Sequence, residues 1–263
     1  MQTEDYDFLY ALEDSFWWFV GMREITAALL DPFCLPNGRA QCVLDAGCGT
    51  GGNLKWLGRY AEEGLRFGVD LVDEAVDFCR TSNHQLVARA SVTALPFQDS
   101  LFDLVTSFDV LGQLTSDSSV EEALRETFRV LKPGGIGFFR VAAHEWMRSD
   151  HDRALATTRR YDLPTLIDLT TQTGFKPLRS TYANTFLLPA AALRRLVLKR
   201  IGLSGKGSDV KPLSPQLGWL NRPLTASLVK EAQWLSRPNM KFPTGLSAIC
   251  VCRKPTSSHS PEA

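Results

Sequence analysis

A glycine-rich loop directly after an apolar run carries the clearest chemical signal in this sequence. Residues 43–46 read VLDA, and residues 47–53 read GCGTGGN. Glycines after a strand allow a tight turn and a close approach to a ligand, which the free N–H groups of the next helix can bind. Four glycines in six residues cost chain entropy without improving packing. The loop therefore predicts a ligand site and not a plain turn.

The charge of Asp45 distinguishes between two ligands for this loop. Glycines 47, 49 and 52 match the G-x-G-x-x-G pattern, so an NAD-dependent oxidoreductase is one hypothesis, although this pattern alone is weak. A carboxylate two residues before the first glycine would repel a pyrophosphate, whereas it suits a ligand with an ammonium group. Asp45 therefore favours a cationic ligand.

Apolar runs that alternate with helical patterns must position this loop. Strands are predicted over residues 42–45, 65–70, 86–88, 102–108, 136–141, 175–182 and 245–252, and helices over 73–82, 120–131, 162–173 and 223–236. This alternation predicts an α/β fold, a parallel sheet with helices on both faces. Ligands of such sheets bind at the carboxyl edge, where Phe108 and Asp109 end the fourth run.

Two stretches fall outside the alternating pattern. An aromatic helix is expected from Tyr6 through Arg23. Residues 183–245 contain the basic helix-like run FLLPAAALRRLVLKRIGL. We expect this run to be a helix that packs on the sheet, in preference to a substrate cap or a contact with lipid headgroups. The expected division is an N-terminal extension (1–40), a core (41–182), a helical insertion (183–245), a closing strand (246–253) and a disordered tail (254–263).

The composition narrows the classes of function. The 263 residues are 44% hydrophobic, and 29 Lys+Arg balance 29 Asp+Glu. This length supports one large domain with a real core, and the zero net charge removes the electrostatic case for nucleic-acid binding. The acidic N-terminus lacks a signal-peptide pattern, no run would span a membrane, and the six cysteines lack zinc-site spacing. We expect a cytoplasmic, metal-free protein without membrane insertion.

Four motifs in order resemble those of the class I S-adenosylmethionine (SAM) dependent methyltransferases, of the methyltransferase type 11 kind. They are LDAGCGTGGN, FGVDLVDEAVDFCR, ASVTALPFQDSLFDLVTSFDVL and LRETFRVLKPGG, and they cover about residues 40–142. The later segments HDRA, RRY, NTFLLP and PTGLS are similar to one bacterial branch of this family. The resemblance implies a Rossmann-like sheet of seven strands, six parallel and the last antiparallel, with SAM as the cofactor.

The resemblance also assigns contacts to the cofactor. Gly47, Gly49 and Gly51 would pass around the methionine part of SAM, with Asp45 near its amine. Asp70 would accept both ribose hydroxyls, because one carboxylate can hold a vicinal diol. The further expected contacts are Arg23, Cys48, Asn53, Leu71, Ser91, Val92 and Phe108.

Four of these further contacts have alternatives or depart from the family pattern. Leu71 and Val92 would flank the adenine or belong to the core, and Arg23 either pairs with the SAM carboxylate or is a solvated arginine. Ser91 stands where the family often has an Asp that receives the adenine amino group. We expect a weaker adenine contact there.

Methyl transfer from a sulfonium needs, above all, the nucleophile and the methyl group to be aligned. It needs a base only where the methyl acceptor must lose a proton. The candidate catalytic residues are His144 and Tyr161, although a lone histidine is more often structural. The candidate substrate contacts are Trp17, Trp18, His151, Tyr182 and Asn184. Gly112-Gln113 replaces a Glu-His pair of many relatives, so that histidine role cannot be transferred.

The leading hypothesis is methyl transfer from SAM to a small-molecule acceptor at O, N or C, with S-adenosylhomocysteine as product. Three alternatives stay open. They are a methyltransferase of lipid-linked substrates that makes a weak peripheral membrane contact, a SAM-binding protein that does not methylate, and an NAD-dependent oxidoreductase.

Overall fold

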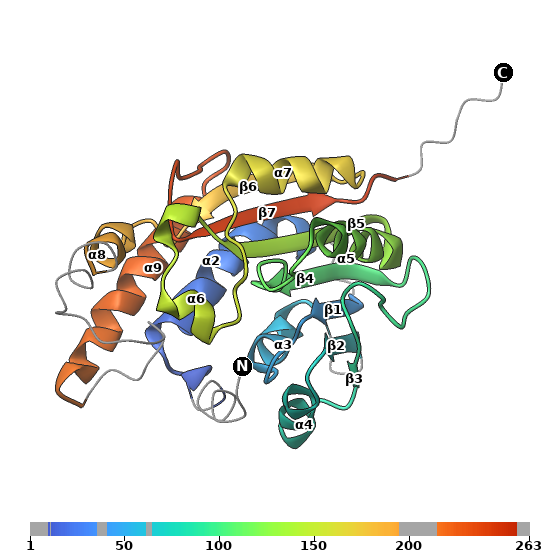
Figure 1. The fold of residues 1–263 in the computed structure, drawn as a ribbon, viewed down its shortest axis with the longest axis horizontal. Helices are drawn as coiled ribbons and strands as arrows, with labels where there is room; N and C mark the ends of the chain where they lie inside the picture. Colours follow the sequence, from blue (N-terminus) through green and yellow to red (C-terminus); the bar gives the residue numbers. More distant parts are fainter. Residues whose placement is uncertain (1–9, 11, 36–40, 62–64, 195–214, 257–263) are drawn as a thin grey trace.

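A computed structural model describes residues 10, 12–35, 41–61, 65–194 and 215–256. Within these ranges a seven-stranded sheet has the order β3-β2-β1-β4-β5-β7-β6 (Figure 1). The strands are β1 (Val43–Ala46), β2 (Arg66–Asp70), β3 (Val87–Arg89), β4 (Phe102–Phe108), β5 (Leu131–Ala142), β6 (Lys176–Ala183) and β7 (Ser247–Arg253).

The pairing confirms the predicted fold class. β1 lies between β2 and β4 and runs parallel to both, and β4 runs parallel to β5. β7 is antiparallel to β5 on one side and to β6 on the other. The sheet is therefore Rossmann-like, with its last strand reversed, and the central β1 is buried along its whole length.

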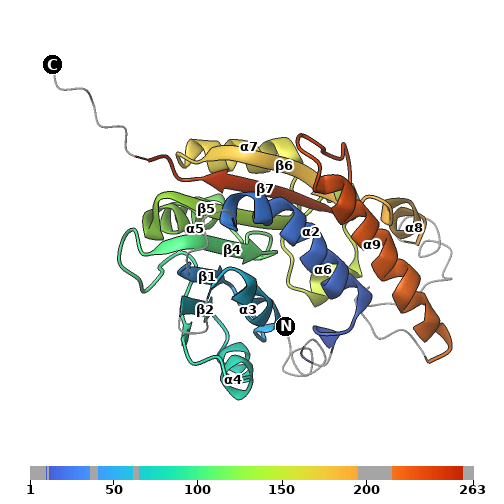
Figure 2. The same ribbon diagram turned by 180° about the vertical axis from the view of Figure 1, so that it is seen from behind.

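Helices cover both faces of the sheet. The helices are α2 (Trp17–Cys34), α3 (Gly52–Trp56), α4 (Asp73–Thr81), α5 (Asp117–Val130), α6 (Asp150–Ala154), α7 (Leu163–Gln172), α8 (Leu188–Ala192) and α9 (Asn221–Leu235). α5 and α7 lie on one face, and α2 and α9 lie on the opposite face, which Figure 2 presents to the viewer. Cys250 and Cys252 of β7 are both buried in this core.

The N-terminal helix differs from its prediction. The predicted range was 6–23, but α2 begins at Trp17 and continues to Cys34, while residues 1–9 and 11 lie outside the described ranges. Ile25, Leu29 and Leu30 are fully buried, and this spacing extends the apolar face beyond Arg23. Gly21 lets α2 approach α9 closely, because a Cβ there would lie 2.4 Å from Leu228 Cδ1.

The expected helical insertion is described only in part. α8 covers the start of the basic run, α9 agrees with the helix predicted over 223–236, and residues 195–214 lie outside the described part. None of the helices in the described ranges combines the length and the apolar character that crossing a bilayer requires.

Candidate active site

A cavity of about 670 Å³ opens at the carboxyl edge of the sheet, where the central strands end. The glycine loop and the ends of β2 and β4 line one part of it, and α2, α8, α9 and the segment around α6 line the rest. In Figure 1 these helices gather at one end of the sheet. Segments from the whole length of the chain therefore share one cavity.

The glycine loop turns sharply because three of its glycines have positive φ. Gly47, Gly49 and Gly51 have φ of 90°, 53° and 93°. At Gly47 an added Cβ would lie 2.2 Å from Val110 Cγ2, whereas at Gly49 it would meet nothing within 4 Å. The loop thus packs against Val110 and leaves open space at Gly49, on the cavity wall.

Asp70 ends β2 and is fixed by two backbone groups. Its Oδ2 accepts the Gly49 N–H at 3.0 Å, and its Oδ1 accepts the Val72 N–H at 3.1 Å. Each carboxylate oxygen can accept a further hydrogen bond, and Asp70 lines the cavity. The arrangement suits a vicinal diol.

Asp45 lies beneath the loop and not on the cavity wall. It is 1% exposed, and its Oδ1 accepts a hydrogen bond from Thr106 Oγ1 at 2.8 Å. Its Oδ2 has no hydrogen-bond partner in the described part of the chain. Burial raises the pKa of Asp45 to about 7, although the Thr106 hydrogen bond and Arg140 oppose the shift. A cationic ligand nearby would favour the carboxylate.

The next part of the cavity suits a flat, mostly apolar ligand group. It is lined by Leu71, Val72, Ala90, Ser91 and Val92. Leu71 is 62% exposed, so this side chain is no part of the core. The Ser91 hydroxyl is hydrogen-bonded to Thr93 Oγ1 at 2.7 Å.

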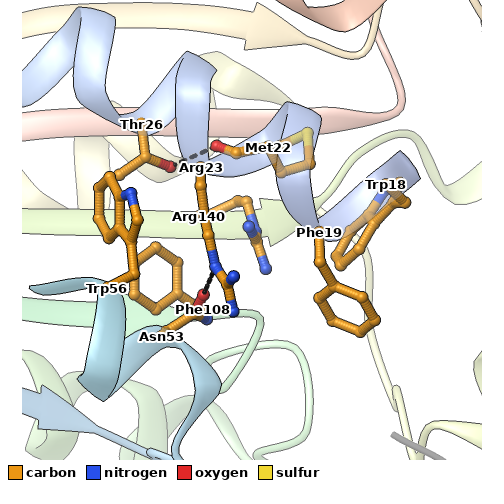
Figure 3. Close-up of a pocket in the computed structure, with 9 residues that line it drawn as sticks. All are labelled: Trp18, Phe19, Met22, Arg23, Thr26, Asn53, Trp56, Phe108 and Arg140. Atoms are coloured by element: carbon orange, nitrogen blue, oxygen red, sulfur yellow. Dashed lines mark hydrogen bonds between the residues drawn. The ribbon is translucent and has the colours of Figure 1, made fainter. Parts of the chain in front are cut away.

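Arg23 of α2 reaches the glycine loop instead of solvent. Figure 3 shows Arg23 and Arg140 together at a small cavity of about 10 Å³ that adjoins Asn53 and Trp18. The Arg23 side chain is 13% exposed, its Nε donates to Asn53 Oδ1 at 3.5 Å, and its buried Nη2 has no partner among the described residues. Arg23 is therefore a half-buried cation that lies 3.8 Å from Asp14 Oδ1 through Nη1 and has one unused donor, Nη2, beside the cavity.

Arg140 of β5 is a site residue that the sequence analysis missed. Its Nη2 donates to Asp109 Oδ2 at 2.6 Å, and its guanidinium lies 4.9 Å from the Trp18 ring and 5.0 Å from the Phe108 ring. The available signal was a single charged residue inside the apolar run IGFFRVA. This cation links α2 to β4 at the cavity.

The remaining part of the cavity is mainly apolar. It is lined by Leu155, Ala156, Leu187, Ala190, Ala191, Leu224 and Leu246, with Thr157, Asn184, Arg194 and Ser247 as polar neighbours. Asp152 and Arg160 also line it, and they form an ion pair at 2.7 Å in which both side chains are 2% exposed.

The structure brings together most of the predicted cofactor contacts but fewer of the catalytic and substrate residues. Those that line the cavity are Trp17, Trp18, Gly47, Cys48, Gly49, Asn53, Asp70, Leu71, Ser91, Val92, Phe108 and Asn184. Gly51 is the residue before α3 and shapes the loop, and the His151 side chain lies outside what the structure describes.

The two candidate catalytic residues are held by protein groups. His144 Nδ1 lies 2.8 Å from Asp162 Oδ1, and its Nε2 lies 3.0 Å from Thr244 Oγ1. The Tyr161 hydroxyl donates to Leu111 O at 3.2 Å, and the Tyr182 hydroxyl accepts the Leu163 N–H. The described residues that line the cavity do not include these three, so their roles stay predictions.

Comparisons with known proteins agree with this architecture. Residues 44–139 match the family model described as a methyltransferase domain. A protein of Encephalitozoon cuniculi that is named as a methyltransferase is 31% identical over 163 residues, which are 53% of this chain and 72% of the relative. The malonyl-[acyl-carrier protein] O-methyltransferase 1 of Coxiella burnetii is 27% identical over 186 residues, 68% of this chain and 63% of that enzyme. The chain spans smaller shares of other curated relatives, down to 28%.

Solved structures share the fold. A phosphoethanolamine N-methyltransferase 2 of Haemonchus contortus, solved with S-adenosylhomocysteine, has a TM-score of 0.60 at 17% identity, covering 97% of this chain and 58% of that one. A SAM-dependent methyltransferase of Thermotoga maritima has a TM-score of 0.56 at 14% identity, with 95% of both chains covered. With the family model and the Encephalitozoon relative, these likenesses lead to one conclusion. The chain belongs to the class I SAM-dependent methyltransferases.

Proposed function

We propose that this protein transfers the methyl group of SAM to a small-molecule acceptor by in-line displacement. The observation that carries the proposal is the cavity of about 670 Å³, whose lining combines the glycine loop and Asp70 with a mainly apolar chamber. Helices α2, α8 and α9 contribute to that wall, so the cavity would enclose its ligands and would not present a flat docking face to a macromolecule.

The residues of the cavity fit SAM. Beneath and beside the glycine loop, Asp45 Oδ2 and Arg23 Nη2 are buried and have no hydrogen-bond partner among the described residues. This acid and this base suit the amine and the carboxylate of an amino acid. Asp70 would hold the ribose hydroxyls, and Leu71 and Val92 would flank the adenine. When bound, SAM supplies an already activated methyl group on a sulfonium.

The chain itself would supply alignment and exclusion of water. Trp17 and Trp18 line the cavity from α2. Asn221 Oδ1 of α9 accepts a hydrogen bond from the backbone N–H of Trp17 at 2.8 Å. This contact joins the first residue of α2 to the first residue of α9. Holding nucleophile and methyl in a near-attack arrangement provides much of the rate in such a displacement.

The proposal is tested by incubating the protein with SAM labelled in the methyl group and a small-molecule fraction of a cell extract. We expect label in a low-mass product, formed in step with S-adenosylhomocysteine. The Asp70→Ala variant should lose this activity at limiting SAM. Label found in macromolecules alone would contradict the small-molecule acceptor, and binding of SAM without any transfer would favour the non-methylating alternative.

A further inference from the structure

One buried amide oxygen in the apolar part of the cavity has no hydrogen-bond partner among the described residues. Asn184 follows β6, lines the cavity and is 3% exposed. Its Oδ1 has no partner among the described residues. Leaving a buried acceptor unsatisfied is unfavourable for folding, so a ligand group that donates a hydrogen bond is what this position lacks.

The turn that carries Asn184 is rigidly held from α9. Glu231 is 0% exposed, and its Oε2 accepts the N–H groups of Thr185 at 2.9 Å and Phe186 at 3.3 Å. On the other side, Thr185 Oγ1 donates to Thr244 O at 2.6 Å. Asn184 has φ of 59°, which asparagine tolerates better than most residues. The backbone that carries the amide is therefore held in place.

Most of the side chains that line this part of the cavity with Asn184 are apolar, and the uncharged polar ones are Thr157 and Ser247. Leucine and alanine side chains from α8, α9 and the segments at 155–156 and 246 line the chamber. Asp152 and Arg160 neutralise each other at 2.7 Å, and Arg194 takes part in an interaction of its own. A charged methyl-acceptor molecule would lose its hydration in this chamber without gaining a dedicated counter-ion.

We propose that the methyl acceptor is a mainly apolar small molecule whose hydroxyl or N–H group donates a hydrogen bond to Asn184. Glu231 is the positioning residue for this contact. The inference rests on the proposed function and adds the substrate class to it. The apolar body of the acceptor fills the leucine- and alanine-lined chamber, and its single donor fixes its orientation.

The test uses the full chain saturated with S-adenosylhomocysteine and two matched probes, 4-hexylphenol and hexylbenzene. The phenol carries a donor, and the hydrocarbon has the same chain without one. We expect the phenol to bind about 3- to 10-fold more tightly, the range of one hydrogen bond. In Asn184→Gly, which keeps the positive φ, the phenol should lose this advantage while hexylbenzene binding stays unchanged.

Two further variants separate recognition from folding. Asn239 also has positive φ, 64°, but is exposed and outside the cavity, so Asn239→Gly should keep the preference for the phenol. Glu231→Met should lose the preference because the turn at 184–186 is released, and Glu231→Gln, which retains an acceptor oxygen, should restore much of it. A change in overall stability alone would not produce this rescue in the phenol-to-hydrocarbon ratio.

The outcomes distinguish the two proposals. The binding of the probes and of the cofactor is measured by calorimetric titration of the same protein. Failure to bind SAM or S-adenosylhomocysteine would overturn the proposed function. Normal binding of S-adenosylhomocysteine with equal affinity for both probes, or with no binding of either, would overturn the apolar-donor inference alone. A preference for the phenol that survives in Asn184→Gly would also overturn it.

Discussion

The carboxylate of Asp70 accepts a hydrogen bond from the backbone N–H of Gly49 at 3.0 Å. This contact joins the end of β2 to the glycine loop after β1, so the predicted ribose-binding residue and the loop that would pass around the methionine part of SAM are one rigid unit. Substitution of either residue should therefore weaken the binding of both the ribose and the methionine part of SAM.

Replacing Asp70 should weaken cofactor binding selectively. We expect Asp70→Ala to cost about 1–3 kcal/mol of SAM binding free energy, because hydrogen bonds to a charged acceptor are lost. Asp73→Ala is the matched control, since Asp73 pairs with Arg89 on the exposed side of α4. Isothermal titration calorimetry measures both, and equal affinity of Asp70→Ala and the wild type would refute the ribose assignment.

The pKa of Asp45, raised by burial to about 7, predicts a pH-dependent affinity for SAM. The folded protein holds a proton on Asp45 between pH 4 and 7 that the unfolded chain releases, so the free energy of unfolding contributed by this group falls as pH rises through that window. A bound ammonium favours the carboxylate. SAM affinity should therefore rise toward pH 7, by up to about tenfold per pH unit.

Proton release on SAM binding measures this effect directly. Calorimetry at pH 6 in buffers of different ionisation enthalpy should show release of close to one proton per SAM bound. Asp45→Asn should abolish the release, while Glu13→Gln controls for a second carboxyl whose pKa burial raises. An unchanged proton count in Asp45→Asn would assign the pH dependence to another group.

The Arg140–Asp109 pair should stabilise the fold more than a surface ion pair does. Arg140 is 6% exposed and Asp109 is 34% exposed, so Asp109→Asn leaves a buried cation without its carboxylate at a cost of about 1–3 kcal/mol. Asparagine tolerates the positive φ of 65° at this position. Urea unfolding measures the change.

Glu121→Gln provides the comparison, because the Glu121–Arg125 pair on α5 is exposed on both sides. Its loss should change the free energy of unfolding by less than about 1 kcal/mol. Equal effects of the two substitutions would mean that solvent screens Arg140 as it screens Arg125.

The close contact between α2 and α9 predicts a strong effect at Gly21. A Cβ in Gly21→Ala would lie 2.4 Å from Leu228 Cδ1, and overpacking of this kind costs about 1–3 kcal/mol. Gly218→Ala meets nothing within 4 Å and should be nearly neutral. Thermal unfolding compares the two, and a Gly21→Ala variant as stable as wild type would show that the helices separate easily.

The sequence predicted the elements whose signal is local. The apolar run at 102–108 agrees with β4 to the residue, and the glycine loop lies at the carboxyl end of β1 as expected. The extent of α2 was predicted wrongly because its buried face is defined by α9, more than 180 residues further along the chain. The apolar residues of α2 keep their helical spacing beyond Arg23, and contact with α9 decides which turns of the helix are buried.

The directions of side chains at the sheet edge were also beyond the sequence. His144 was a candidate catalytic residue, but its φ of 59° accompanies a ring that is hydrogen-bonded to Asp162 and Thr244. Arg140 meets Trp18 only because β5 and α2 converge at the cavity. Residue type and strand order predict which residues reach an edge, and packing decides which of them face a ligand.

The position of β7 between β5 and β6 has a consequence for biosynthesis. In the completed sheet β6 pairs with β7 and not with β5, so on the ribosome residues 176–183 lack their neighbouring strand until residues 247–253 have been made. Meanwhile β5 presents an open strand edge, which can pair with another nascent chain. Translation of residues 184–246, which include α8 and α9, therefore sets how long the half-built sheet stays exposed.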